Sequence, residues 1–272
     1  MKMRPLIGQL GQAASHTFTA LADGFVDLLL PAVCGACGRA DKLEDGLCPR
    51  CRMELLALVS VASCPRCGGS LGPNIPARAD GCGQCQTALP RFGRTYRLGS
   101  YAGPLRHAVR DLKYRRQLRL RRRLTALLAE RIQADATAGD DTPPPRYDVV
   151  QAVPMHWRRR LARGFDHAHV IASALAGHLG VPMGCELVRV RNTPPQVRLS
   201  RTRRIENVRG AFAVRDPDVV AGADVLLVDD VTTTGATANE AARVLLDAGA
   251  QRVALAVLAK AEPPRAYAHC QA

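Results

Sequence analysis

The chain has 272 residues, enough for one large domain or two of unequal size. Hydrophobic residues make up 47% and aromatic residues only 4%, so any core must be largely aliphatic. The formal net charge of +14 favours anionic partners such as nucleic acid, phosphorylated metabolites or anionic lipid, with a compositional bias toward Arg as the alternative explanation. No stretch approaches the ~18–20 apolar residues of a membrane span, which excludes a membrane-spanning class.

Residues 1–30 are predicted to form an N-terminal helix. The apolar run that starts at Leu21 is interrupted by Asp23 and Asp27 and is followed by Pro31. This pattern indicates an amphipathic helix rather than a secretion signal. We therefore expect a cytoplasmic protein without a membrane span.

The segment 31–90 is rich in Cys, Gly and Pro, and it holds eight of the ten cysteines in four Cys-x2-Cys pairs. The pairs are Cys34 and Cys37, Cys48 and Cys51, Cys64 and Cys67, and Cys82 and Cys85. Two such pairs supply four thiolates, which suits tetrahedral Zn²⁺ in a closed structural site. A reducing compartment also disfavours disulfides. We therefore predict a double zinc ribbon with two structural zinc ions; a redox dithiol and an iron–sulfur cluster are the competing interpretations.

The pairing of these cysteines is a separate question. We favour sequential ribbons, in which the first two pairs form one site and the last two pairs form the other, over a cross-braced arrangement. The spacing leaves open whether the ribbons only hold a small segment without a core folded or also bind nucleic acid or a protein partner. Cys185 and Cys270 stand alone, and we assign them no function.

From Arg94 onward, predicted strands and helices alternate. Strands or extended segments are expected at 95–101, 147–153, 181–190, 224–228 and 253–258. Helices are expected at 105–134, 166–179 and 236–248, and a proline-rich loop at 139–145. Apolar strands that alternate with helices of this length predict an α/β domain over 94–262, with a parallel sheet covered on both faces.

The predicted helix at 105–134 contains a strongly basic stretch at 113–123. Seven of its eleven residues are cationic: Lys113, Arg115, Arg116, Arg119, Arg121, Arg122 and Arg123. That number allows several phosphate contacts with a strong salt dependence, so the stretch is a candidate nucleic-acid-binding surface. Tyr114 is the one aromatic residue there that could stack on a base. A solvated helix face is the alternative.

The predicted strand 147–153 is followed by a turn with four arginines, Arg158, Arg159, Arg160 and Arg163. Guanidinium groups bind phosphate oxygens in bidentate fashion, so this turn is a candidate pyrophosphate site. The alternative is again a solvated basic face.

The predicted strand 224–228 leads into Asp229 and Asp230, then into a loop at 232–237 that precedes a helix. Backbone amides and the helix dipole favour an anion at such a helix N-terminus. Gly235 lets the backbone approach a phosphate closely, and the hydroxyls of the loop threonines can donate to its oxygens. The two carboxylates fit beside a phosphate if they accept hydrogen bonds from sugar hydroxyls or lie near Mg²⁺. An ordinary capped helix after a strand is the alternative.

The run from Val225 to Thr237 resembles the phosphoribosyl pyrophosphate motif of the type I phosphoribosyltransferases, which has four hydrophobic residues, two acids and a Thr-Thr-Gly-x-Thr loop. The resemblance implies the fold of that family. It also implies that Asp229 and Asp230 hold the ribose hydroxyls. The loop that would hold the 5′-phosphate consists of Thr233, Thr234, Gly235, Ala236 and Thr237. Purine phosphoribosyltransferases often carry an acid in this loop, whereas this chain has Thr233, which makes ordinary purine salvage less favoured.

Zinc knuckles followed by such a domain resemble the ComF/GntX family, which includes competence proteins of DNA uptake. Matching segments are Leu112–Tyr114, Arg163–His167, Arg191–Gln196, Leu199–Ser200 and Gly210–Phe212, together with Arg204 and Asn207. Asp166 and His167 depart from the Asn-Gln of the family. The resemblance implies binding of phosphoribosyl pyrophosphate with Mg²⁺, and a role in handling single-stranded DNA together with other competence proteins.

Two functional hypotheses follow. The first is an enzyme that transfers phosphoribosyl to an unknown acceptor; its catalytic residues are unknown, and His156 and His167 are the candidates for a general base. The second is a non-catalytic competence protein that handles single-stranded DNA and uses the site to bind a ligand. The sequence specifies neither the acceptor nor the oligomeric state nor the pathway.

Overall fold

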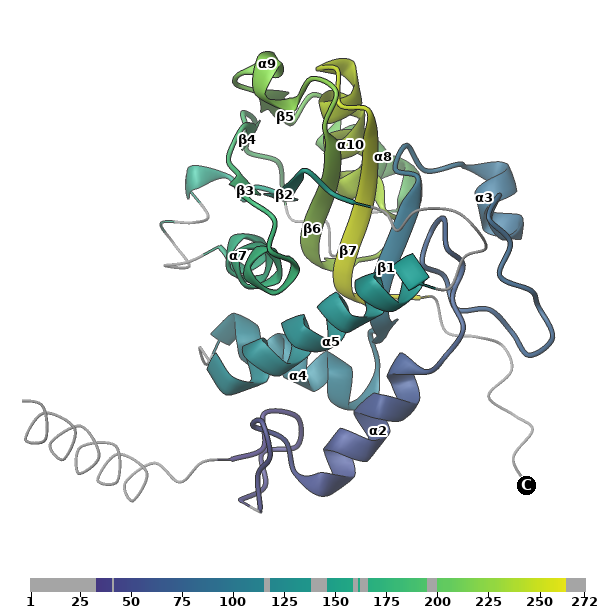
Figure 1. Cartoon of the computed structure of the whole chain (residues 1–272), viewed down its shortest axis with the longest axis vertical. Coiled ribbons are helices and arrows are strands. Elements are labelled where there is room, and N and C mark those ends of the chain that lie inside the picture. Colours follow the sequence, from purple (N-terminus) through teal and green to yellow (C-terminus); the bar gives the residue numbers. More distant parts are fainter. Residues whose placement is uncertain are drawn as a thin grey trace, which may run out of the picture.

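The computed structural model describes residues 33–40, 42–114, 118–137, 146–158, 161, 166–194 and 200–262. Five parallel strands form the main sheet in the order β1–β7–β6–β2–β3. Their bounds are β1 Arg94–Ser100, β2 Val149–Ala152, β3 Met183–Gly184, β6 Asp224–Thr232 and β7 Arg252–Lys260. The two long strands β6 and β7 lie side by side in the sheet (Figure 1).

Helices cover both faces of this sheet (Figure 1). The helices on one face are α4 (Gly103–Tyr114), α5 (Leu118–Thr137) and α7 (His167–Leu179), whose apolar side chains share a buried cluster with β1, β2, β6 and β7. On the other face, α10 (Ala236–Asp247) forms a second buried cluster, and α8 (Arg201–Val208) lies beside it. Burial on both faces explains why β6 and β7 are almost continuously apolar. The predicted parallel sheet between two helical layers is confirmed.

A short antiparallel pair lies outside the main sheet. It consists of β4 (Leu187–Arg189) and β5 (Phe212–Val214), and the short helix α9 (Pro217–Val220) follows it. The sequence predicted one extended segment at 181–190, but the structure divides it between β3 and β4, which belong to different sheets. Gly184 permits the close pairing of β3 with β2, because a Cβ atom there would lie 2.8 Å from Val149 Cγ2.

Two further expectations differ from the structure. The single basic helix expected at 105–134 is described as α4 and α5, and residues 115–117 between them lie outside the description. Strand β6 does not end at Val228, where its pairing with β2 stops, but continues to Thr232 because β7 still pairs with it there. The predicted N-terminal helix at 1–30 and the loop at 139–145 lie outside the described residues.

The chain leaves the neighbouring strands β2 and β6 in opposite directions. After β2 it passes through α7 on one face to β3, whereas after β6 it passes through α10 on the other face to β7. In open α/β sheets, ligands bind at the carboxyl ends of two strands that diverge in this way. Here the turn 153–158 and the loop 232–237 follow those two ends.

The cysteine-rich segment forms two units that both pack against the sheet domain. The first unit contains α2 (Pro49–Val59), and its Leu47 and Leu55 belong to the same buried cluster as Leu120 and Leu124 of α5. The second unit contains α3 (Gly83–Thr87) and lies next to β1, where the backbone N–H of Thr95 donates to the carbonyl of Pro65 at 2.7 Å. Within the part of the chain that is described, no helix has the length and apolar character needed to cross a membrane.

Candidate functional site

The loop 232–237 connects the end of β6 to the start of α10. Gly235 takes the left-handed conformation, with φ of +77°, and is the N-cap residue directly before α10. A glycine offers no side chain to cap the helix, and the nearby Thr234 Oγ1 accepts only a long bond of 3.4 Å from the Ala236 amide. Gly235 therefore gives α10 no side-chain cap, and the backbone amides at such a helix N-terminus favour an anion.

A cavity of about 180 Å³ opens beside this loop. Its lining combines one carboxylate, several hydroxyls and one guanidinium, and it consists of Arg204, Asp229, Val231, Thr232, Thr233, Gly235, Ala236 and Thr237. Donors and an acceptor thus converge in a space large enough for a phosphate group. Four of the five predicted phosphate-loop residues line it, and the fifth, Thr234, lines a larger neighbouring cavity.

The two predicted ribose carboxylates are consecutive residues of β6. Successive side chains of a strand point to opposite faces, and only Asp229 lines the small cavity. Each carboxylate also accepts a hydrogen bond from the amide of the residue that follows it, at 2.8 Å for Asp229 and 2.6 Å for Asp230. Both side chains are half-buried at the carboxyl end of the strand.

Arg204 is a residue of this site that the sequence analysis did not single out as functional. It projects from α8, and its Nη1 donates to Thr233 Oγ1 at 2.8 Å. Ser200 caps the start of α8 by accepting from the Arg203 amide at 3.4 Å, which helps to orient this basic helix. The cluster of arginines after Ser200 was visible in the sequence, but only the packing of α8 beside α10 shows which of them reaches the loop.

The turn that follows β2 holds the predicted pyrophosphate arginines. Arg158 is exposed and stacks its guanidinium 5.2 Å from the ring centroid of Trp157. Arg159, Arg160 and Arg163 lie outside the described residues.

Asp166 ties this turn to the start of α7. Its carboxylate accepts from the amides of Met155, at 3.0 Å, and His169, at 3.3 Å. An Asn at this position can cap a helix in the same way, so the departure from the resembled family at 166 preserves the local structure. His156 and His167 are both buried, and neither lines the two cavities beside the loop.

The eight paired cysteines form two clusters of four. The sulfur atoms of Cys34, Cys37, Cys48 and Cys51 lie within 4.8 Å of one another, and so do those of Cys64, Cys67, Cys82 and Cys85. Sequential pairing is therefore correct. The Sγ–Sγ distances are 3.8 Å for Cys37–Cys48 and Cys64–Cys85, and 3.7 Å for Cys67–Cys82. A tetrahedral zinc ion with Zn–S bonds of about 2.3 Å separates its ligands by about 3.8 Å, so both clusters fit zinc.

The backbone around the clusters also favours thiolates. The amide of Cys48 donates to Cys34 Sγ at 3.3 Å, and the amide of Gly69 donates to Cys67 Sγ at 3.4 Å. Burial opposes ionisation of Cys34, but backbone hydrogen bonds, chiefly that from Cys48, lower the pKa of its thiol to about 7. Burial and the neighbouring cysteines raise the pKa of the Cys51 thiol. The two four-cysteine clusters are consistent with two structural zinc ions.

Three arginines of the basic stretch at 113–123 have side chains that the structure describes. Arg122 of α5 is exposed, whereas Arg121 and Arg123 are half-buried. Arg123 Nε lies 3.7 Å from Asp45 Oδ2 of the first cysteine unit, so this cation joins α5 to that unit. The side chains of Lys113, Arg115, Arg116 and Arg119 lie outside the description.

Comparison with family models matches residues 25–91 to a double zinc ribbon domain and residues 166–269 to a phosphoribosyl transferase domain. The DNA utilization protein YhgH of Salmonella typhi is 33% identical over 229 residues, which cover 83% of this chain and 96% of that protein. Competence protein F of Haemophilus influenzae is 29% identical over 220 residues, covering 80% and 92% of the two chains.

Among solved structures, the glutamine phosphoribosylpyrophosphate amidotransferase of B. subtilis is 25% identical over half of this chain, with a TM-score of 0.33. This chain spans about a quarter of the length of that enzyme.

Proposed function

Because this chain belongs to the ComF/GntX family, in which a double zinc ribbon precedes a type I phosphoribosyltransferase domain, we propose that it binds phosphoribosyl pyrophosphate and Mg²⁺ at the loop 232–237. The observation that carries this proposal is the convergence of Asp229, the loop hydroxyls and the start of α10 on one small cavity. That cavity lies at the carboxyl end of β6, and the carboxyl ends of parallel strands are where α/β sheets bind ligands.

Each part of the ligand has a counterpart in the chain. Asp229 and Asp230 would accept hydrogen bonds from the ribose hydroxyls, and Thr233–Thr237 would donate to the 5′-phosphate. Arg158 and its neighbours Arg159, Arg160 and Arg163 would hold the pyrophosphate. Mg²⁺, when bound, would neutralise part of the pyrophosphate charge. We propose the domain bounds 1–30 for the N-terminal helix, 31–90 for the double zinc ribbon and 94–262 for the phosphoribosyltransferase domain.

The same arrangement supports transfer of phosphoribosyl to an acceptor. In that reaction the bond between ribose C1′ and the pyrophosphate oxygen breaks while a bond from the acceptor nucleophile to C1′ forms. Amide donors and cationic side chains that are fixed before the reaction would stabilise the charge on the leaving pyrophosphate. A screen for pyrophosphate release over nucleobases and amines tests turnover, with Asp229→Ala/Asp230→Ala as the background. No release above that background with any acceptor would favour a protein that only binds the ligand.

Binding is tested separately by isothermal titration calorimetry with phosphoribosyl pyrophosphate and Mg²⁺. We expect saturable binding by the wild type and its loss in Asp229→Ala/Asp230→Ala. Asp218→Ala is the matched control, because Asp218 is an exposed carboxylate on α9 and lines neither cavity beside the loop. Wild-type protein that shows no binding would contradict the proposal.

The second candidate function is the handling of single-stranded DNA in a DNA-uptake context, alone or with other competence proteins. It is favoured by the names of the two relatives, which refer to DNA utilization and to competence. Arg122 is exposed on α5 and could contact phosphate, and Arg119, Arg121 and Arg123 share that helix. Single-stranded DNA that binds equally well at low salt after replacement of these four arginines would exclude α5 as its surface.

A further inference from the structure

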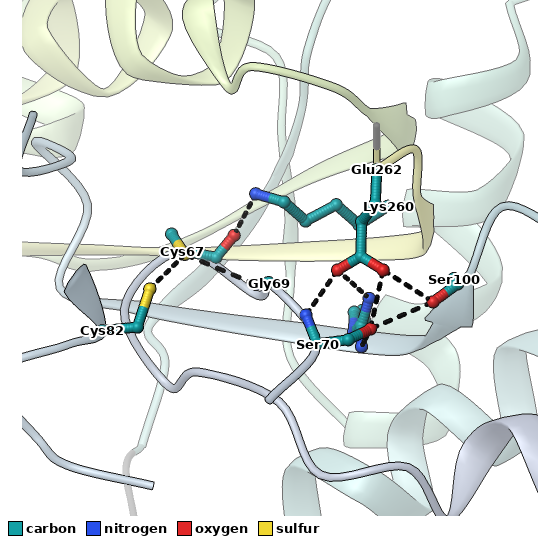
Figure 2. Close-up of polar contacts among 8 residues, drawn as sticks. Cys67, Gly69, Ser70, Cys82, Ser100, Lys260 and Glu262 are labelled. Atoms are coloured by element: carbon teal, nitrogen blue, oxygen red, sulfur yellow. Dashed lines mark hydrogen bonds and ion pairs between the residues drawn. The ribbon is translucent and has the colours of Figure 1, made fainter. Parts of the chain in front are cut away.

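The two zinc ribbons contact the sheet domain in different ways. The second ribbon is joined to the end of β7 by polar contacts, which Figure 2 shows. Lys260 Nζ donates to the carbonyl oxygen of Cys67 at 2.6 Å. Glu262 Oε2 accepts from Ser70 Oγ at 2.7 Å and from Ser100 Oγ at 2.9 Å. The first ribbon, by contrast, buries one apolar face of α2 against α4 and β1.

Helix α2 is apolar on two opposite faces. On the inner face, Leu55 is buried and Leu58 is half-buried in the cluster shared with the sheet domain. On the outer face, Met53 is 66% exposed and Leu56 is 37% exposed, and Val61 just after the helix is 40% exposed. A helix that is apolar all round is normally covered on both sides. The described part of the chain leaves the outer face of α2 uncovered.

The outer face forms one continuous stripe along the helix. Its residues follow one another at intervals of three, one, three and one positions, which places them on the same side of α2. They are Met53, Leu56, Ala57, Ser60 and Val61, called the α2 stripe below, and all five are exposed. Single exposed apolar residues are common, whereas a contiguous apolar surface marks a contact site. The small Ala57 and Ser60 leave room between the larger side chains for those of a second helix.

The chain enters the first ribbon close to one end of this stripe. Cys34 and Cys51 belong to the same four-cysteine cluster, and Cys51 lies in the first turn of α2. The described part of the chain starts one residue before Cys34. The three residues 31–33 can span at most about 10 Å. The segment that ends at Leu30 is therefore tethered near the Met53 end of the stripe.

The sequence of this segment, residues 21–30, matches the stripe. At helical spacing, Leu21, Phe25 and Leu28 share one face, and the two acidic residues of the segment lie on the opposite face. A helix of this length extends about 15 Å, and the stripe is about 12 Å long. The match to a double zinc ribbon domain begins at residue 25, so the end of the segment belongs to the same domain as the first ribbon.

We propose that residues 21–30 form a helix that lies antiparallel to α2 and covers the α2 stripe. Because the segment ends near Met53, it runs back toward Val61, with Phe25 and Leu28 facing the stripe. A second copy of the chain is the competing occupant, but three large side chains offer far less than the ~800 Å² per partner of a stable interface. A tethered segment needs less area, because a short linker gives it an effective concentration on the order of millimolar.

Photo-crosslinking in the full chain tests this contact. The photoreactive residue benzoylphenylalanine takes the place of Phe25, and mass spectrometry locates the crosslinks. We expect the major crosslink to fall in the tryptic peptide 53–66, which contains the whole stripe. In an equal mixture of unlabelled and isotope-labelled protein, both crosslinked peptides should carry the same label, because the segment and the stripe belong to one chain.

Met53→Glu places a charge on the stripe and should reduce this crosslink by about fivefold or more, because burial of an unpaired charge is costly. Val219→Glu is the matched control, because Val219 is 60% exposed on α9, outside the stripe. It should leave the crosslink unchanged. Zinc content verifies that the ribbons are intact in both variants.

Hydrogen exchange supplies a second measurement that needs no crosslinker. In full-length Leu28→Asp, peptides that cover the stripe should exchange about fivefold faster or more, because α2 loses its cover, and peptides that cover α10 should be unchanged. The inference is overturned if the crosslinks fall mainly outside 53–66 or join chains of different label, which would indicate a second copy. It is also overturned if Met53→Glu keeps the full crosslink and Leu28→Asp leaves exchange at the stripe unchanged.

Discussion

The ion pair between Arg97 and Glu262 gives the sharpest prediction about stability. Arg97 Nη1 lies 3.3 Å from Glu262 Oε1, and the two side chains are 1% and 19% exposed. Arg97 also donates from Nη2 to Ser70 Oγ at 2.5 Å, so the pair joins β1, the segment after β7 and the second ribbon. Replacing Glu262 by Gln removes the negative charge but keeps a side chain of nearly the same shape.

Removing one partner of a buried ion pair costs about 3–5 kcal/mol, because the other charge stays buried without compensation. Glu262 is partly exposed, and Gln can still accept from Ser70 and Ser100, so we expect a smaller loss, of about 2–3 kcal/mol in unfolding free energy. For a protein of this size, 1 kcal/mol corresponds to roughly 2–4 °C in Tm, so the Tm of Glu262→Gln should fall by about 4–12 °C.

Thermal and urea unfolding monitored by circular dichroism measure this loss. The control is Asp247→Asn, which removes a carboxylate from the exposed ion pair with Arg243 and should change stability by less than about 0.5 kcal/mol. A Glu262→Gln protein as stable as this control would refute the reasoning.

The pH dependence of the unfolding free energy tests the same ion pair in a second way. Burial opposes ionisation of Glu262, but hydrogen bonds from Ser70 and Ser100 and the charge of Arg97 hold its pKa below the usual 4.5. A carboxyl group whose pKa is lower in the folded state stabilises the fold above its unfolded pKa, and this contribution is lost as the pH falls through the folded value. The stability difference between wild type and Glu262→Gln should therefore be full near neutral pH and shrink below about pH 4.5.

Three further predictions concern other parts of the chain. Wild-type protein should contain two zinc ions per chain, and the Cys48→Ser and Cys82→Ser variants should each retain one zinc ion, as measured by atomic emission. A single variant that lost both ions would contradict two separate sites. Asp166→Ala should lower the unfolding free energy by about 1 kcal/mol, because the N-cap of α7 is lost. Asp166→Asn should keep the cap and change the unfolding free energy by less than about 0.5 kcal/mol. Urea unfolding measures both variants, and equal losses would refute the capping role. If α5 contacts single-stranded DNA, Arg122→Glu should weaken DNA binding and reduce the slope of log affinity against log salt concentration by about 0.7. Fluorescence anisotropy measures this slope, and an unchanged slope would count against the contact.

The parts of the fold that the sequence predicted correctly are those in which the local pattern of residue types matches the burial or the contacts that the structure gives them. Strands β6 and β7 are buried on both faces, so their apolar runs are nearly continuous and could be recognised in the sequence. The zinc ribbons follow from the fixed Cys-x2-Cys spacing, and the sequential grouping of the cysteines is confirmed. Asp166 and Gly180 mark the ends of α7 as an N-cap and a left-handed C-cap, which accounts for the accurate bounds of that helix.

What the sequence did not reveal depends on contacts between distant segments. The extension of β6 to Thr232 requires pairing with β7, and the reach of Arg204 to Thr233 requires the packing of α8 beside α10. The cavity between the second ribbon and the loop brings together Leu89 and Thr233, which lie far apart in the chain. No local pattern encodes such a juxtaposition, because both walls are solvent-facing surfaces of their own units.

Hydrogen exchange followed by mass spectrometry, with and without phosphoribosyl pyrophosphate and Mg²⁺, tests the central claim most directly. The first amides of α10 lie at the proposed phosphate contact, so ligand binding should slow exchange in peptides that cover 229–240. Peptides that cover α9 should be unaffected, and the protection should disappear in Asp229→Ala/Asp230→Ala. Unchanged exchange at 229–240 at saturating ligand, or protection confined to another part of the chain, would contradict a phosphoribosyl pyrophosphate site at this loop.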